Sequence, residues 1–303
     1  MPPPPRPTDA GTVGGHSGAA PPGFVVLVPP GDRIHFIDWG GSGEPAVLLV
    51  HGLGGSTAVW SPVARRIAHR RRVVAMDLRG HGLSDAPTEP EAYALETLAD
   101  DAVAVAEGSG ALDDASVGGT SVTLVGHGFG AIVAAVAASR LGSRCARLLL
   151  VDGGLVDVAA TTGQDVDEFL RGLDEPPEVL RSMTAFLADR RAWDPGSWDD
   201  DQERAARAAV VETPAGRLVQ ATRPHALEAS VRAMFTYRPD TVLSAVVAPI
   251  VAVVRQTPGD DDAAPGRTPA AERFVARTIE LEAPGHNLMR YRPAEVTAAI
   301  LDG

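Results

Sequence analysis

Ser121-Val-Thr-Leu-Val-Gly-His-Gly-Phe-Gly-Ala131 is the stretch that decides the fold of this chain. It begins with a short apolar run rich in β-branched residues, which is typical of a buried strand. Glycines then occupy alternate positions 126, 128 and 130, and the alanine-rich run that follows, Phe129–Leu141, ends at Gly142. Alanine favours helices, and glycine commonly ends them. The sequence therefore predicts a strand, a tight turn and a helix.

This setting is that of the nucleophile elbow, Gly-x-Ser-x-Gly, in which a strained turn presents a serine hydroxyl at the end of a strand. Gly126 and Gly130 fill the two glycine positions, but position 128 holds glycine where the pattern has serine. Without a hydroxyl at 128, acyl transfer through an ester intermediate has no starting atom. Because 128 is not aspartate either, the sequence also excludes an alkyl-enzyme intermediate there.

Short apolar runs alternate with helical stretches from about residue 24 onward. Several runs are continuously apolar, as expected for strands buried on both faces, and repeated strand–helix–strand units imply a mostly parallel sheet wound on both sides. The fold class is therefore α/β. The expected strands are Phe24–Val28, Ile34–Trp39, Ala46–Val50, Arg72–Met76, Val122–Val125, Arg147–Val151, Ile250–Val254 and Thr278–Leu281. The expected helices are Ala58–His69, Glu91–Glu107, Phe129–Leu141 and Pro293–Leu301.

Residues 154–245 break this alternation. They contain acidic, proline-containing helical segments and no clear buried strand, which indicates an all-helical insertion between two strands of one sheet. We expect a core of residues 24–153 and 246–303 and a helical cap, or lid, of residues 154–245. Residues 1–23 are rich in Pro, Gly and Ala, so we expect a disordered tail rather than a signal peptide.

Four motifs follow the expected strands in a fixed order. They are His51-Gly-Leu-Gly-Gly55, Asp77-Leu-Arg-Gly-His-Gly-Leu-Ser84, Gly126-His-Gly-Phe-Gly130 and Gly285-His286-Asn287. Together they resemble the α/β-hydrolase superfamily, in its capped esterase, lactonase and epoxide-hydrolase-like branch. The resemblance covers about residues 24–303. It implies a doubly wound sheet of the α/β-hydrolase type with an inserted helical cap.

The resemblance also implies roles for residues around the elbow. The backbone N–H groups of Leu53 and Phe129 correspond to the oxyanion hole, and neither contribution depends on the side chain. His286 stands where the family places its general base, which suits a ring that titrates near neutrality. The Asp77–Ser84 loop corresponds to an architectural turn, and His51, His81 and His127 to satisfied structural histidines.

The acid that should orient His286 stays open at this point. The family pattern after strand Ile250–Val254 would be Gly-x-x-Asp, but counting along this chain puts Arg255 and Pro258 at those two positions. A lengthened loop could bring Asp260 into the role, with Asp262 as an alternate. Asp152, at the end of strand Arg147–Val151, is the other alternate. A solvated acidic run over 260–262 is an equally good interpretation.

Composition excludes several classes of function. The formal net charge is −12, so the surface should repel nucleic acid and anionic membranes. Cys145 is the single cysteine, which excludes an intramolecular disulfide and makes a reducing cytoplasm the expected location. No apolar run approaches the roughly 20 residues that span a bilayer. The sequence has no metal cluster, phosphate loop or dinucleotide fingerprint, so we expect no cofactor.

Three functional hypotheses follow. The favoured one is a catalytically silent relative, or pseudoenzyme, that binds a small hydrophobic carbonyl or ester-like molecule. The second is an enzyme without a covalent intermediate, in which His286 activates water or moves a proton in lyase, cyclase or isomerase chemistry. The third is a serine hydrolase disabled by substitution at 128. In each, the partner is a small molecule.

Overall fold

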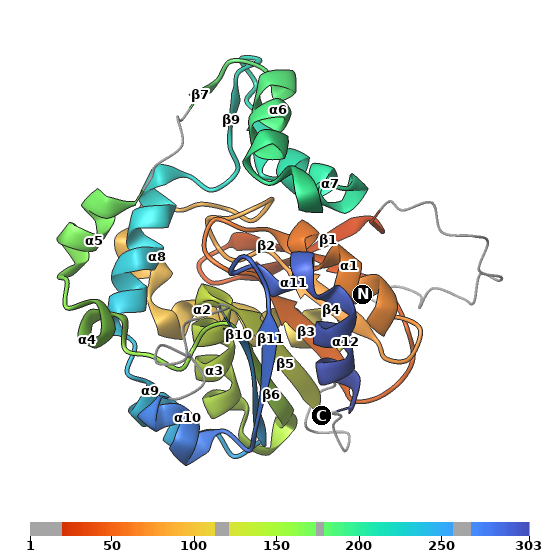
Figure 1. The fold of residues 1–303 in the computed structure, drawn as a ribbon, viewed down its shortest axis with the longest axis vertical. Helices are drawn as coiled ribbons and strands as arrows, with labels where there is room; N and C mark the ends of the chain where they lie inside the picture. Colours follow the sequence, from red (N-terminus) through yellow and green to blue (C-terminus); the bar gives the residue numbers. More distant parts are fainter. Residues whose placement is uncertain (1–19, 113–120, 174–178, 257–267, 303) are drawn as a thin grey trace, which may run out of the picture.

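The computed structural model describes residues 20–112, 121–173, 179–256 and 268–302. An eight-stranded sheet lies at its centre, in the order β1-β2-β4-β3-β5-β6-β10-β11 (Figure 1). The first pairings, β1 with β2 and β2 with β4, are antiparallel, and all later pairings are parallel. The strands are β1 Gly23–Val28, β2 Asp32–Asp38, β3 Ala46–Val50, β4 Val73–Met76, β5 Val122–His127, β6 Cys145–Val151, β10 Ile250–Gln256 and β11 Arg277–Glu282. The predicted mostly parallel α/β sheet is confirmed.

Alternate side chains of the central strands enter two separate apolar layers. In β3, every residue is buried: Leu48 packs into one layer, whereas Val47 and Leu49 pack into the other. Two-sided burial removes each such side chain from water, which stabilises the fold by roughly 1.5–3 kcal/mol per large aliphatic residue. This is why β3 is a continuous apolar run rather than an alternating one.

Helices cover both faces of the sheet. One layer is completed by α1 (Ser61–Ile67), α11 (Leu288–Tyr291) and α12 (Pro293–Asp302). The other is completed by α2 (Leu95–Gly108), α3 (Phe129–Leu141), α9 (Pro239–Ser244) and α10 (Pro269–Phe274). Short 3₁₀ turns, η1 (Thr57–Trp60) and η2 (Pro90–Tyr93), precede α1 and α2. No helix among the described residues is long and apolar enough to cross a membrane.

The segment between β6 and β10 forms the insertion, part of which lies at the top of Figure 1 around α6 and α7. It contains α4 (Val158–Thr162), α5 (Val166–Gly172), α6 (Met183–Trp193), η5 (Pro195–Ser197), α7 (Asp200–Ala208) and α8 (Pro224–Thr236). The expectation that it is all-helical is wrong. Strands β7 (Val179–Leu180), β8 (Val210–Glu212) and β9 (Leu218–Gln220) form a small antiparallel sheet. Strands of two or three partly exposed residues are too short to show a period of two.

Candidate active site

The turn between β5 and α3 has the backbone that the sequence predicts. Gly128 adopts φ 54° and ψ −117°, a region that residues with a β-carbon rarely occupy. Its N–H donates to the carbonyl of Val151, 3.0 Å away, which fixes the turn against β6. The flanking glycines are required by packing, because a β-carbon at Gly126 or Gly130 would lie within 2.2 Å of backbone oxygens. The elbow therefore keeps its strained geometry although position 128 has no side chain.

His286 lies directly beside this turn, as the motif predicts. It belongs to the loop between β11 and α11, and its Nε2 is 2.9 Å from the position that a β-carbon on Gly128 would take. Its Nδ1 donates a hydrogen bond of 2.6 Å to Oδ2 of Asp152. A neutral ring protonated on Nδ1 leaves Nε2 as a proton acceptor facing position 128. The His286 side chain is 57% exposed, so solvent reaches it.

Asp152 follows the last residue of β6 and is held from two sides. It is the one non-glycine residue with positive φ, 45°, among the described parts of the chain. Its N–H donates to the carbonyl of Val253, and its Oδ1 accepts from the N–H of Arg255 at 3.0 Å. Burial alone would raise the pKa of Asp152, but the hydrogen bonds from His286 and Arg255 hold that pKa below its usual value. Asp152 is therefore held as a carboxylate that accepts a hydrogen bond from His286.

Of the three acids considered from the sequence, the structure brings Asp152 to His286. Asp260 and Asp262 lie outside the described residues. Arg255, which stands where the family pattern has glycine, contributes its backbone N–H to Asp152. The chain thus departs from the family's Gly-x-x-Asp pattern after β10 and has an aspartate, Asp152, at the end of β6. The positive φ of a single aspartate cannot be predicted from one sequence. The sequence therefore offers no reason to prefer Asp152 over Asp260 or Asp262.

Of the two residues expected to form an oxyanion hole, Phe129 follows Gly128 directly, and Leu53 follows Gly52, which lies near position 128. Phe129 begins α3, so its backbone N–H belongs to the free amino end of that helix. Leu53 lies in the loop after β3, where Gly55 N–H closes a turn on the Gly52 carbonyl at 3.0 Å. The Gly52 α-carbon is 3.8 Å from the β-carbon position at 128. The role of the Leu53 and Phe129 N–H groups stays a prediction.

His127 contacts His286 in a way that the sequence did not indicate. Its Nε2 donates to the backbone carbonyl of His286 at 3.0 Å, and the two ring centroids are 4.4 Å apart. Burial, and then the nearby His286, lower the pKa of His127 to about 3. A neutral His127 ring therefore holds the His286 loop against the end of β5. The only sequence signal was its place inside the elbow motif.

The Asp77 loop is architectural, as expected. The Asp77 carboxylate accepts hydrogen bonds from the Thr57 N–H at 2.6 Å, the Leu83 N–H at 3.0 Å and the His35 ring at 2.7 Å. His51 is also satisfied, since its Nε2 accepts from Leu78 N–H at 3.0 Å. For His81 the expectation holds on one side of the ring: its Nδ1 donates to the Arg79 carbonyl at 3.0 Å, whereas its buried Nε2 has no partner among the described residues.

The insertion is fastened to the helix that follows His286. Arg290, in α11, donates from Nε to Ser197 and lies 3.4 Å from a carboxylate oxygen of Asp194. The Tyr291 hydroxyl donates to the same Asp194 carboxylate at 2.7 Å. Arg290 is also 6.0 Å from the centre of the Trp193 ring. These contacts join η5 and the end of α6 to a helix that begins two residues after His286.

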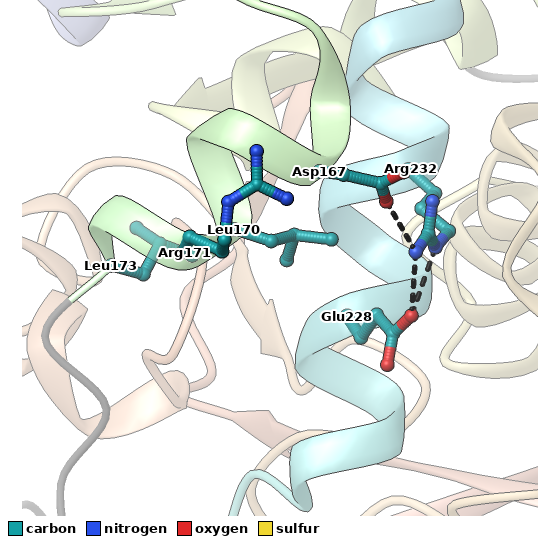
Figure 2. Close-up of a pocket in the computed structure, with 6 residues that line it drawn as sticks. All are labelled: Asp167, Leu170, Arg171, Leu173, Glu228 and Arg232. Atoms are coloured by element: carbon teal, nitrogen blue, oxygen red, sulfur yellow. Dashed lines mark hydrogen bonds and ion pairs between the residues drawn. The ribbon is translucent and has the colours of Figure 1, made fainter.

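A separate hollow of about 560 Å³ lies between α5 and α8. Figure 2 shows Arg232 at its edge, between the carboxylates of Asp167 and Glu228, with 2.8 Å to each. Arg232 is therefore already paired with two carboxylates, and none of the residues that line the hollow belongs to the Gly128 site. No group of three or more His, Cys, Asp or Glu side chains in the described ranges could hold a metal ion.

Comparisons with known proteins agree with this fold. A family model described as alpha/beta hydrolase family matches residues 47–300. Epoxide hydrolase 4 of Mus musculus is 36% identical over 111 residues, and an uncharacterised protein of Mycobacterium tuberculosis is 41% identical over 115 residues. These alignments cover 37% and 38% of this chain but only 29% and 30% of the relatives. The chain therefore matches less than a third of the length of these curated relatives.

Solved structures match over much more of the chain. The crystal structure of E-2-(acetamidomethylene)succinate hydrolase covers 92% of this chain and 97% of its own, with a TM-score of 0.75 at 20% identity. Such low identity supports the shared fold alone.

Proposed function

This chain belongs to the alpha/beta hydrolase family, and we propose that it hydrolyses a small carbonyl compound, such as an ester or lactone, without an acyl-enzyme intermediate. The observation that supports this most is the Asp152–His286 hydrogen bond of 2.6 Å, because it orients Nε2 toward the position where the family nucleophile would stand. A carboxylate paired with a histidine is the usual orientation device for a general base.

The proposed reaction replaces the missing hydroxyl with water. A water molecule hydrogen-bonded to His286 Nε2 attacks the carbonyl carbon while Nε2 takes its proton. The Asp152 carboxylate stabilises the imidazolium that forms. Negative charge that develops on the carbonyl oxygen is stabilised by the N–H groups of Leu53 and Phe129. The imidazolium then returns the proton to the departing alkoxide as the carbon–oxygen bond breaks, giving an alcohol and an acid.

The strain at Asp152 supports a functional role for the pair. A non-glycine residue with positive φ costs on the order of 1–3 kcal/mol and persists only where its surroundings impose it. Here the imposed conformation aims the carboxylate at His286. A protein that only binds a ligand at the amino end of α3 has no evident use for a charged aspartate that orients His286.

Catalytically silent ligand binding, which the sequence alone favours, is the second candidate. It is supported by the lack of any nucleophilic side chain at position 128. The amino end of α3 would still attract a carboxylate or a polarised carbonyl oxygen. The third hypothesis, a serine hydrolase disabled at 128, gains support because Asp152 can supply the acid.

Kinetics with a panel of p-nitrophenyl esters and lactones would separate these candidates. Water activation predicts steady turnover without a burst, no labelling by a fluorophosphonate, and loss of turnover in His286→Ala. Turnover that His286→Ala leaves unchanged would refute the proposal. Ligand binding with no turnover on any substrate would favour the silent binder. A burst or covalent labelling of the unmodified protein would contradict both.

A further inference from the structure

A second cavity lies at the amino-terminal ends of the parallel strands, whereas His286 lies beyond their carboxyl-terminal ends. Its volume is about 410 Å³, which is within the range of small-molecule sites. It is lined by residues at the starts of β3, β5, β6, β10 and β11 and by the end of α12. Gly128, Asp152 and His286 all follow the ends of strands, so the two places are separated by the length of the parallel strands.

The cavity combines apolar walls with three arginines. Its walls include Val251 and Ile300, whereas Arg71, Arg147 and Arg277 supply guanidinium groups, and no lining residue is acidic. A cavity lined by three arginines and no acidic residue is unusual in this protein, because the net charge of the chain is −12.

The three guanidinium groups are poorly compensated. Among the described residues, no ion pair joins Arg71, Arg147 or Arg277 to a carboxylate. Arg71 and Arg147 each donate to a backbone carbonyl, of Glu44 and Ile300 respectively. The Nε of Arg147 is buried and has no partner in the described part of the chain. Burial, and then the charge of Arg71, lower the pKa of Arg147, and the charge of Asp302 offsets this only in part, which means that the Arg147 charge is held at a cost.

The hollow between α5 and α8 provides the contrast. There Arg232 is flanked by Asp167 and Glu228, so its charge is neutralised within the protein (Figure 2). In the cavity at the strand starts, the neutralising group is lacking from the described lining. Guanidinium groups bind carboxylates and phosphates through paired hydrogen bonds, and apolar walls accept a hydrocarbon body.

We propose that the cavity formed by Arg71, Arg147 and Arg277 at the amino-terminal edge of the sheet binds a small organic anion with an apolar body. Its anionic group meets the guanidinium groups, and its hydrocarbon part lies against Val251 and Ile300. The site is independent of the hydrolysis proposed for His286.

Calorimetric titration of the full chain at low ionic strength tests this. The probes are hexanoate, hexyl phosphate, inorganic phosphate and hexanol. We expect saturable binding of the hexyl anions, much weaker binding of inorganic phosphate and none of hexanol. Tighter binding of hexanoate would identify the preferred anionic group as a carboxylate, and tighter binding of hexyl phosphate would identify it as a phosphate. No saturable binding of either hexyl anion, or equal binding of hexanol, would overturn the proposal.

Variants locate the binding. Arg277→Gln should weaken hexyl-anion affinity about tenfold, the effect of losing one charge-assisted hydrogen bond. Arg277 is exposed, and its side chain makes no hydrogen bond or ion pair with the described residues, so this variant should fold even if Arg147→Gln does not. Arg273→Gln removes the same charge from an exposed arginine paired with Asp240 and should leave affinity unchanged. His286→Ala should also bind normally. Equal affinities in Arg277→Gln and Arg273→Gln, or loss in His286→Ala, would place the anion elsewhere.

Discussion

Gly128 has a backbone conformation that a side chain would strain, and its neighbour His286 occupies space that a side chain would need. A β-carbon there would lie 2.9 Å from Nε2 of His286, so the ring would have to move by a few tenths of an ångström. The ring is 57% exposed and hydrogen-bonded to Asp152, so such a movement is feasible. The consequences of restoring a nucleophile can therefore be predicted.

Gly128→Ser should lower the free energy of unfolding by about 1–3 kcal/mol, the cost of a β-carbon in this conformation. It should also create fluorophosphonate labelling and a burst with p-nitrophenyl esters, because Asp152 and His286 complete a serine triad. Chemical denaturation and probe labelling measure the two effects.

Gly128→Ala is the matched control for that change. It introduces the same strain without the hydroxyl, so it should lose similar stability and show no labelling. If the serine variant folds but shows neither labelling nor a burst, the Asp152–His286 pair does not act as a catalytic dyad.

Asp152→Asn tests the acid directly. Asparagine tolerates positive φ, so the fold should be kept. The amide cannot accept from both His286 and the Arg255 N–H as the carboxylate does, and it carries no charge to stabilise an imidazolium. We expect the hydrolysis rate to fall at least about 100-fold. Asp157→Asn makes the same chemical change at the N-cap of α4, where asparagine also caps, and should leave the rate unchanged. Equal rates in both variants would contradict the role of Asp152.

At the scale of elements, the core could be predicted because its signals are strong and local. The strand Ala46–Val50 and the helix Phe129–Leu141 have the bounds expected from the sequence. Buried strands are continuously apolar, and glycines mark the turn between β5 and α3. The position of His286 beside the turn could be predicted because the Gly285-His286 motif follows a strand. Each of these features can be recognised from a few residues that are adjacent in the sequence.

Features that depend on distant contacts could not be predicted. Asp152, which is hydrogen-bonded to His286, is 134 residues away from it in the chain, and its other carboxylate oxygen accepts from the Arg255 N–H. The strands β7, β8 and β9 are too short for a periodic signal. The contact of Arg290 with η5 joins residues more than 90 apart in the chain, and neither partner belongs to a recognisable motif.

Arg290→Ala should release η5 and the end of α6 from α11. The Arg290 side chain is only 12% exposed and loses its bonds to Ser197 and Asp194, so local opening should become easier by about 1–3 kcal/mol. Hydrogen exchange of amides in residues 183–208 should then be about tenfold faster or more, with little change in β3 and β5.

Arg232→Ala is the control for this loss of an arginine. Its partners Asp167 and Glu228 are exposed and lie within the insertion, where surface ion pairs contribute little. Exchange in residues 183–208 should stay unchanged in this variant. Equal exchange in the two variants would show that Arg290 does not fasten the insertion.

The molecule as a whole contains several buried, neutral histidines. Burial lowers the pKa of His81 and of His127 to about 3, compared with an ordinary value of 6.5, and it also lowers the pKa of His51. The unfolded chain takes up protons on these rings below pH 6.5, whereas the folded chain does not. Their contribution to stability is therefore complete above pH 6.5 and is lost as the pH falls toward 3.

Urea unfolding at pH 7.5 and pH 5.0 measures this loss. One such histidine changes the free energy of unfolding by at most about 1.4 kcal/mol per pH unit, so roughly 2 kcal/mol between pH 6.5 and pH 5.0. His127→Gln keeps an N–H donor for the His286 carbonyl but cannot be protonated, so its decline should be smaller by up to that amount. Asp77 and Asp152, whose pKa values are also lowered, add a further loss only below about pH 4, since their stabilising effect requires the carboxylate form. A decline between pH 6.5 and pH 5.0 that is identical in His127→Gln and the unmodified protein would mean that the His127 ring is protonated in the folded state.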